Sequence, residues 1–175
     1  MAKLVEQNHP ALHQIAEEVT KEEFENGFVK KLIKDMKTAL HSYRAEGFVG
    51  IAIAAPQIGV PKRVFLVEFQ EHASEPLPNL VAVNPKIVKL SKKTEVVGEG
   101  CLSVPEHYGA VSRHKNVTLR AFDENGDEFE RGAGGLLAQI FQHEVDHLDG
   151  TLFVDRAEEL WHKDELAHVK LREAK

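Results

Sequence analysis

The pattern His-Glu-x-x-His at residues 143–147 constrains the fold more than any other feature of this chain. On a helix, side chains four residues apart lie on one face, one turn apart. His143 and His147 can therefore bind one metal ion there, with Glu144 beside it as a base. Residues 136, 139, 140, 143 and 147 share one helical stripe, which is mostly apolar until the histidines. The alternative is a pair of ordinary helix histidines.

A metal centre of this kind needs a third protein ligand if one coordination position is to stay open for water. The only cysteine of the chain, Cys101, lies in the Gly-rich stretch at residues 99–103. A thiolate suits soft and borderline metals, although a lone cysteine is also commonly a small buried hydrophobe. Cys101 is far from the histidines in the sequence, so only the fold can bring the three side chains together.

The overall composition is that of an ordinary globular protein. At 175 residues, one compact domain covering residues 1–175 is expected. A net charge of −6 argues against a broad nucleic-acid surface, so no direct nucleic-acid readout is expected. No apolar run approaches the ~20 residues that cross a bilayer, and residues 1–13 do not resemble a secretory signal. A single cysteine fits a reducing compartment, and together these features predict a cytoplasmic protein without a membrane partner.

The first half of the chain predicts one helix and two strands. Apolar residues recur at helical spacing over residues 28–46, with a lysine cluster on the other side and Gly47 after the end. Residues 63–69 and 80–90 are rich in Val, Ile, Leu and Phe and are predicted strands. Residues 72–79 include two prolines and are predicted to form the loop between them. Asn84-Pro85 is expected to bend the second strand or to place it at an edge.

The second half predicts a hairpin followed by two helices. Residues 117–122 and 128–131 flank Asn125-Gly126, a strong β-hairpin signal. A glycine-rich stretch precedes a predicted helix over residues 136–148, and Gly150 follows it. Residues 157–174 predict a surface-packed helix that clamps the fold or docks a partner. We therefore expect an α+β fold in which antiparallel strands surround a central metal-binding helix, with N- and C-terminal helices.

A third stretch, residues 50–57, combines small residues with a final Pro-Gln pair. Small side chains allow the backbone to approach a ligand or another strand closely. The stretch therefore fits a binding strand that ends in a catalytic Gln57. It also fits a tightly packed strand and turn in which Gln57 is a surface residue.

Taken together, residues 50–57, 99–103 and 143–147 closely resemble the three motifs of the peptide deformylases. Those motifs have the forms G-φ-G-φ-A-A-P-Q, E-G-C-φ-S and H-E-φ-D-H, where φ is apolar, and their order and approximate spacing match. The resemblance implies a metal-dependent amide hydrolase that removes the formyl group from formyl-methionine of newly made polypeptides and releases formate. It also implies one divalent metal ion, most often Fe(II), with Zn, Ni or Co as replacements, bound by Cys101, His143 and His147.

The resemblance also implies roles for other residues. Glu144 takes a proton from water and returns it to the departing amine. The side-chain amide of Gln57 and the backbone N–H of Leu102 stabilise the charge that develops on the formyl oxygen. The implied substrate-binding residues are Gly50, Ile51, Ala52, Gly100, Leu136, Gln139 and Ile140. The implied partners are N-formyl-methionyl peptides, with a transient ribosome contact through the predicted C-terminal helix.

Two residues depart from the family pattern, and one pair of charges suggests a supporting contact. Ala52 replaces the second glycine of the first motif, and its Cβ narrows the space for a substrate backbone. Gln139 lies one turn before His143, where an apolar pocket wall is expected, and a buried amide there needs a partner. Arg113 and Asp146 can form an ion pair that ties the cysteine segment to the histidine helix; the alternative is that Arg113 is simply solvated.

Two other functions remain open from the sequence. One is a zinc peptidase that cuts internal peptide bonds, whose third ligand is usually Glu or His rather than Cys. The other is a catalytically weak deformylase-like module that binds peptides or docks on the ribosome. Ala52 and Gln139 are the only residues that favour this second alternative.

Overall fold

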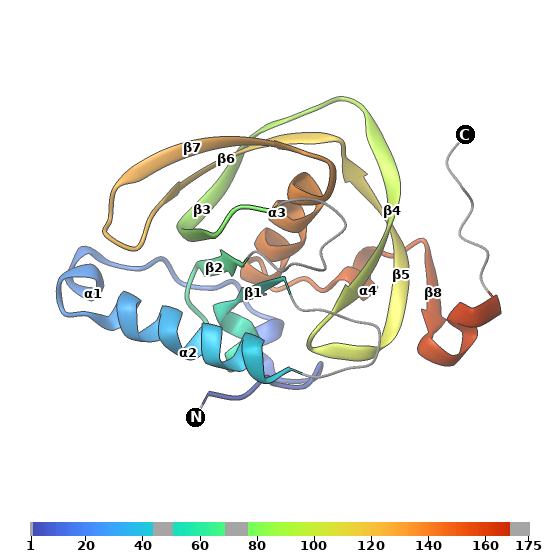
Figure 1. Cartoon of the computed structure of the whole chain (residues 1–175), viewed down its shortest axis with the longest axis horizontal. Helices are drawn as coiled ribbons and strands as arrows, with labels where there is room; N and C mark the ends of the chain where they lie inside the picture. The colour runs from blue at the N-terminus through green and yellow to red at the C-terminus, as the bar shows by residue number, and fades with distance from the viewer. Residues whose placement is uncertain (1, 44–50, 69–76, 169–175) are drawn as a thin grey trace.

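A computed structural model of the chain describes residues 2–43, 51–68 and 77–168. It confirms the α+β class, because helix α3 (Gly135–Leu148) lies between two antiparallel sheets (Figure 1). The larger sheet has the strand order β1 (Ala52–Ala54), β2 (Val64–Val67), β3 (Leu80–Leu90), β6 (Asn116–Phe122) and β7 (Glu128–Gly134). The smaller sheet has the order β4 (Thr94–Cys101), β5 (Val104–His114) and β8 (Glu159–His162).

Helix α2 (Phe28–Ser42) covers β1 and β2, the first two strands in the order of the larger sheet. Its apolar face packs against β1 and β2 in one buried cluster, in which Met36, Ile53 and Leu66 are fully enclosed. Lys30, Lys31 and the rest of the predicted lysine face point away from this cluster. The predicted helix is therefore confirmed over the described residues, and residues 44–46 of the prediction lie outside them.

Helix α3 follows the predicted range almost residue for residue. It is buried along most of its length, and Phe141 packs on Phe65 of β2 with ring centroids 5.9 Å apart. Gly150, just past the end, has φ of +73°. A Cβ there would lie 2.9 Å from the backbone of Gln14, so this close approach requires glycine.

The strand and turn predictions also hold where the structure describes them. Asn84 has φ of +51°, and the register of β3 against β6 shifts beside it, so the predicted bend is present. Strands β6 and β7 form the predicted hairpin, in which Gly126 has φ of +89°. The side chain of Asp123 accepts hydrogen bonds from the backbone N–H groups of Asn125 and Asp127 and fixes the turn. Of the predicted loop at 72–79, only residues 77–79 are described.

The C-terminal helix begins later than predicted and is shorter within the described residues. Residues 159–162 form β8 rather than helix, and a 3-10 helix η3 (Lys163–His168) follows. The reason is tertiary: β8 pairs with the edge of β5, and a Cβ added to Gly109 would lie 3.0 Å from the side chain of Leu160. The close pairing of β8 with β5 outweighs the tendency of this charged segment to form a helix on its own. Residues 169–175 lie outside the description.

The short helices complete the fold. They are η1 (Pro10–Leu12), α1 (Lys21–Glu25), η2 (Ala55–Ile58) and α4 (Phe153–Arg156). Among the described residues, no helix has the length and apolar character needed to span a membrane.

Candidate active site

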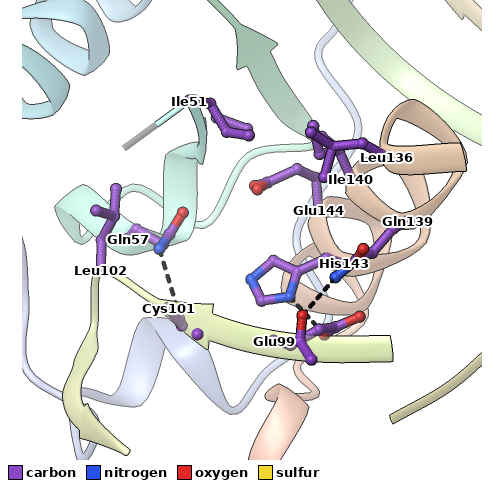
Figure 2. A pocket seen from close by; sticks show the side chains of 13 residues that line it. Ile51, Gln57, Glu99, Cys101, Leu102, Leu136, Gln139, Ile140, His143 and Glu144 are labelled. Carbon is purple, nitrogen blue, oxygen red and sulfur yellow. Dashed lines mark hydrogen bonds and ion pairs between the residues drawn. The ribbon is translucent and has the colours of Figure 1, made fainter. Parts of the chain in front are cut away.

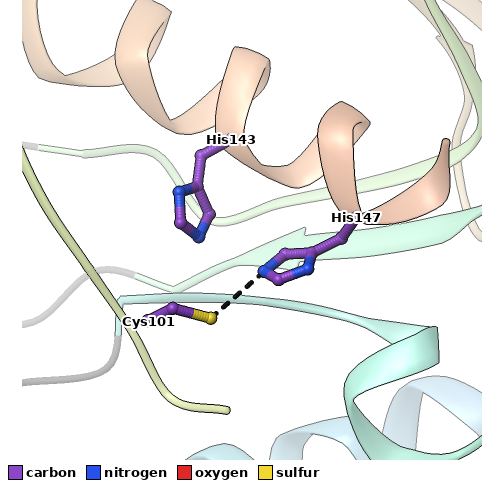
Figure 3. A group of neighbouring side chains, drawn as sticks. All are labelled: Cys101, His143 and His147. Atoms are coloured by element: carbon purple, nitrogen blue, oxygen red, sulfur yellow. Dashed lines mark hydrogen bonds between the residues drawn. The ribbon is translucent and has the colours of Figure 1, made fainter. Parts of the chain in front are cut away.

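The fold brings the single cysteine and the two histidines of the motif together (Figure 3). Cys101 ends strand β4, and His143 and His147 lie one turn apart on α3. One possible ligand atom from each residue lies within 4.8 Å of the other two, and Cys101 Sγ is 3.3 Å from His147 Nε2. The convergence that the sequence left open is therefore present.

The spacing of these atoms fits a single metal ion. A tetrahedral ion with a sulfur at ~2.3 Å and a nitrogen at ~2.0 Å places those two atoms about 3.5 Å apart. The observed separation of Sγ from His147 Nε2 is close to this value. The two imidazole rings are nearly perpendicular, at 82°, with centroids 4.9 Å apart. The three side chains thus form a compact donor set of one sulfur and two nitrogens.

Behind the donor set lies a buried network of charged side chains. Glu99 accepts a hydrogen bond from His143 Nδ1 at 2.9 Å, which leaves the other ring nitrogen for the metal. Arg113 donates two hydrogen bonds to Glu99, at 2.7 and 2.9 Å, and a third to Asp146 at 2.6 Å. The Arg113–Asp146 contact expected from the sequence is thus present. Arg156 of α4 adds a second cation to Asp146, at 2.7 Å.

Glu99 is a site residue that the sequence reasoning missed. It belongs to the cysteine motif, and a signal was available: residues two apart on a strand share a face, so Glu99 points to the same side as Cys101. Burial raises the pKa of its carboxyl, but hydrogen bonds from Arg113 and His143 outweigh burial and hold that pKa at about 2. Glu99 is therefore an anion under ordinary conditions.

Glu144 is a buried carboxyl group that directly follows His143 in the sequence. Its side chain is 4% exposed, and its Oε2 atom has no hydrogen-bond partner among the described residues. Burial raises the pKa of Glu144 to about 7, the positive charge of His143 opposes this rise, and the negative charge of Glu99 adds to it. A carboxyl group with such a pKa can both accept and donate a proton near neutral pH.

Gln57 and Leu102 both lie near the cysteine, on the same side of it in the view of Figure 2. Gln57, in η2, is 1% exposed, so the alternative of a surface residue is wrong. Its Oε1 accepts a hydrogen bond from the backbone of Ala54 at 2.8 Å, and its Nε2 lies 3.4 Å from Cys101 Sγ. The amide is thereby oriented with its nitrogen toward the metal-binding atoms. Leu102 directly follows Cys101 and is also buried.

A pocket opens in front of these groups, between the edge of β1 and the edge of β4 (Figure 2). Glu144, His143 and Cys101 lie among its lining residues. The pocket is also lined by six of the seven residues predicted to bind substrate, namely Ile51, Ala52, Gly100, Leu136, Gln139 and Ile140. The seventh, Gly50, lies outside the described residues.

Comparison with known proteins gives one consistent result. A family described as polypeptide deformylase matches residues 1–163. Peptide deformylases of Phenylobacterium zucineum and Carboxydothermus hydrogenoformans are both 40% identical, over 93% and 92% of this chain and 90% and 96% of their own lengths.

Solved structures agree. A class I type b peptide deformylase from Acinetobacter baumannii, bound to Met-Ala-Ser, has a TM-score of 0.81 at 33% identity, over 89% of this chain and 99% of that one. The Thermotoga maritima peptide deformylase has a TM-score of 0.78 at 32% identity, over 91% and 99%. The matched residues include all three motifs and the complete donor set, and the chain belongs to the polypeptide deformylase family.

Proposed function

We propose that this protein is a peptide deformylase that removes the formyl group from N-terminal formyl-methionine of newly made polypeptides and releases formate. The observation that carries this proposal is the cluster of Cys101, His143 and His147 in a pocket also lined by Glu144, a buried residue whose Oε2 has no hydrogen-bond partner among the described residues. Family membership supplies the substrate class. The proposed site of action is the cytoplasm, where new chains leave the ribosome.

The residues of the site have separate roles in the proposed hydrolysis. A divalent ion on Cys101, His143 and His147 supplies Lewis-acid chemistry, which makes water more acidic and polarises a carbonyl group. Glu144 takes the proton of the attacking water and then passes it to the amine as the bond from formyl carbon to nitrogen breaks. In the protein without metal, burial raises the pKa of Glu144 to about 7, so the pocket favours the protonated form that the second transfer requires.

We assign two N–H donors to the charge that develops on the formyl oxygen. A primary amide nitrogen carries two hydrogens. One hydrogen of Gln57 Nε2 points toward Cys101 Sγ, and the other is the donor that we assign to the formyl oxygen. The backbone N–H of Leu102 supplies the second donor. Such preoriented donors are typically worth about 3 kcal/mol of transition-state stabilisation each.

The position of the pocket explains how it can hold a peptide. Among the described residues, β1 is an edge of the larger sheet and β4 an edge of the smaller one, so each has backbone groups without a described strand partner on the pocket side. An extended peptide can hydrogen-bond to such edges as an added strand. We assign this role to the backbones of Gly50, Ile51, Ala52 and Gly100. The first side chain of the substrate would then face Leu136, Gln139 and Ile140 on α3.

We propose Fe(II) as the ion in the cell, with Zn, Ni or Co as functional replacements. A donor set that includes a thiolate favours such soft or borderline metals over magnesium or calcium. We also propose a transient contact with the ribosome through the C-terminal segment.

Formate release from formyl-Met-Ala-Ser, by anaerobically purified protein with its metal content measured, tests the proposal. We expect turnover by the wild type, and loss of turnover with retained metal in Glu144→Gln. Cys101→Ala should lose both metal and activity, whereas retained metal would favour a zinc peptidase. Tight peptide binding without formate release would favour the binding module instead.

A further inference from the structure

Gln139 is a polar pocket residue that the proposed reaction does not use. It lies on the same face of α3 as Leu136, Ile140, His143 and Glu144, and all five line the pocket. Figure 2 shows that Leu136, Gln139 and Ile140 come from the same helix. Of these three, only Gln139 has a hydrogen-bonding group, so it places an amide within an otherwise apolar wall.

A single hydrogen bond fixes this amide. Gln139 Nε2 donates to the carbonyl oxygen of Gly98 in β4, at 2.9 Å, and thereby joins α3 to the strand opposite. An amide has two N–H donors and one acceptor oxygen. Within the described part of the chain, neither the second N–H nor Oε1 of Gln139 has a protein partner. The anchored amide therefore presents one donor and one acceptor for other molecules.

Filling the pocket changes the surroundings of these two groups. In the free protein Gln139 is only partly buried, so water can hydrogen-bond to its amide. A substrate side chain that packs against this wall displaces that water. An apolar side chain leaves the donor and the acceptor unpaired, whereas a polar side chain of the same length can replace the lost bonds.

We propose that Gln139 is a specificity-determining residue, and that the pocket, besides formyl-methionine, accepts N-formyl peptides whose first side chain has the length of methionine and ends in a hydrogen-bond acceptor. This inference rests on the proposed deformylase function. The first residue of a new polypeptide is a methionine, and the form of methionine that meets this description is the sulfoxide, whose polar oxygen arises by oxidation of the thioether. That oxygen accepts the second N–H of Gln139.

The test compares two substrates on two enzymes. The substrates are formyl-(methionine sulfoxide)-Ala-Ser and formyl-norleucine-Ala-Ser, which differ in polarity but have side chains of similar length. The variant is Gln139→Met, which keeps the length and helix propensity of glutamine and removes its hydrogen bonds. We expect the ratio of kcat/KM for the sulfoxide peptide to that for the norleucine peptide to fall about fivefold or more, the effect of one neutral hydrogen bond.

The ratio separates specificity from structure. Gln139→Met also breaks the bond to Gly98, but any general loss that follows affects both peptides and cancels. Gln14→Met, the same substitution at an exposed position outside the pocket, should leave the ratio unchanged. An unchanged ratio in Gln139→Met would overturn this inference and leave the proposed function standing. Absence of formate release from either peptide, and from formyl-Met-Ala-Ser, by the wild type would instead overturn the proposed function.

Discussion

Two contacts between helix and sheet hold this molecule together by different physical means. Helix α2 meets β1 and β2 mainly through apolar side chains, with Met36 and Ile53 fully enclosed. Helix α3 meets β4 and β5 largely through Glu99, Arg113 and Asp146, all buried and joined by short hydrogen bonds. Apolar packing is non-directional, whereas hydrogen-bonded ions hold side chains in one orientation. The comparison teaches that directional contacts occur where His143, the proposed metal ligand, has to be held in one orientation.

Removing the central cation of the buried network is expected to have the largest effect on stability. Arg113→Met keeps apolar bulk but leaves the carboxylates of Glu99 and Asp146 without their shared partner. Breaking a buried ion pair on one side typically costs about 3–5 kcal/mol. We expect a loss in that range for the metal-free protein, together with weaker metal binding, measured by urea unfolding in the presence of a chelator and by metal titration. A loss below about 1 kcal/mol would show that the network does not hold the two elements together.

A cavity in the apolar contact should affect stability without affecting the metal site. Met36→Ala removes a fully buried side chain from the face of α2. Large-to-small changes of this kind cost about 2–5 kcal/mol, depending on how far the site collapses. We expect about 3 kcal/mol in the same unfolding experiment and an unchanged metal affinity. If metal affinity fell as far as in Arg113→Met, the proposed division between the two contacts would be wrong.

Glu99→Gln tests orientation with a minimal change of shape. The amide oxygen can still accept a hydrogen bond from His143 Nδ1, but the negative charge that favours this arrangement is lost. Loss of such a supporting partner of a metal ligand typically weakens metal binding 10- to 100-fold. Competition with a chelator of known affinity measures the change. Glu95→Gln, on the same strand but half-exposed and paired at the surface with Lys115, is the matched control and should have no effect.

The same comparison explains what the sequence could and could not predict. The apolar stripe of α2 and the alternating pattern around Asn125-Gly126 are local, and both predictions hold. The Arg113–Asp146 contact was predictable because Asp146 lies inside the histidine motif and Arg113 follows Cys101 by twelve residues. Glu99 was missed because its role depends on side chains two residues apart lying on one face of a strand. The sequence around Glu99 shows no clear alternation of apolar and polar residues that would predict this strand. Residues 159–162 were assigned to a helix because nothing local shows that β5 leaves an edge for them.

A surface ion pair should give the smallest effect and complete the contrast with Arg113. At the edge of the apolar contact, Glu68 pairs with Lys37 of α2 at 2.9 Å and with His41. Burial raises the pKa of the Glu68 carboxyl, but hydrogen bonds from Lys37 and His41 outweigh burial, and the pKa is lowered from 4.5. Because the folded-state pKa is the lower one, Glu68 contributes stability above about pH 4.5, and that contribution is lost as the pH falls through the folded-state pKa.

Glu68→Gln should therefore cost less than about 1 kcal/mol at pH 7, as exposed pairs usually do, and less still at high salt. Below pH 4.5 the difference between variant and wild type should shrink, since protonation removes the same charge from the wild type. Urea unfolding at pH 7, 5 and 3.5 measures this trend. If Glu68→Gln lowered the free energy of unfolding at pH 7 as much as Arg113→Met does, burial of the charges would not decide what an ion pair contributes to stability. Its position in the fold would decide instead. A constant small loss at all three pH values would show that Glu68 acts through its shape and not through its charge.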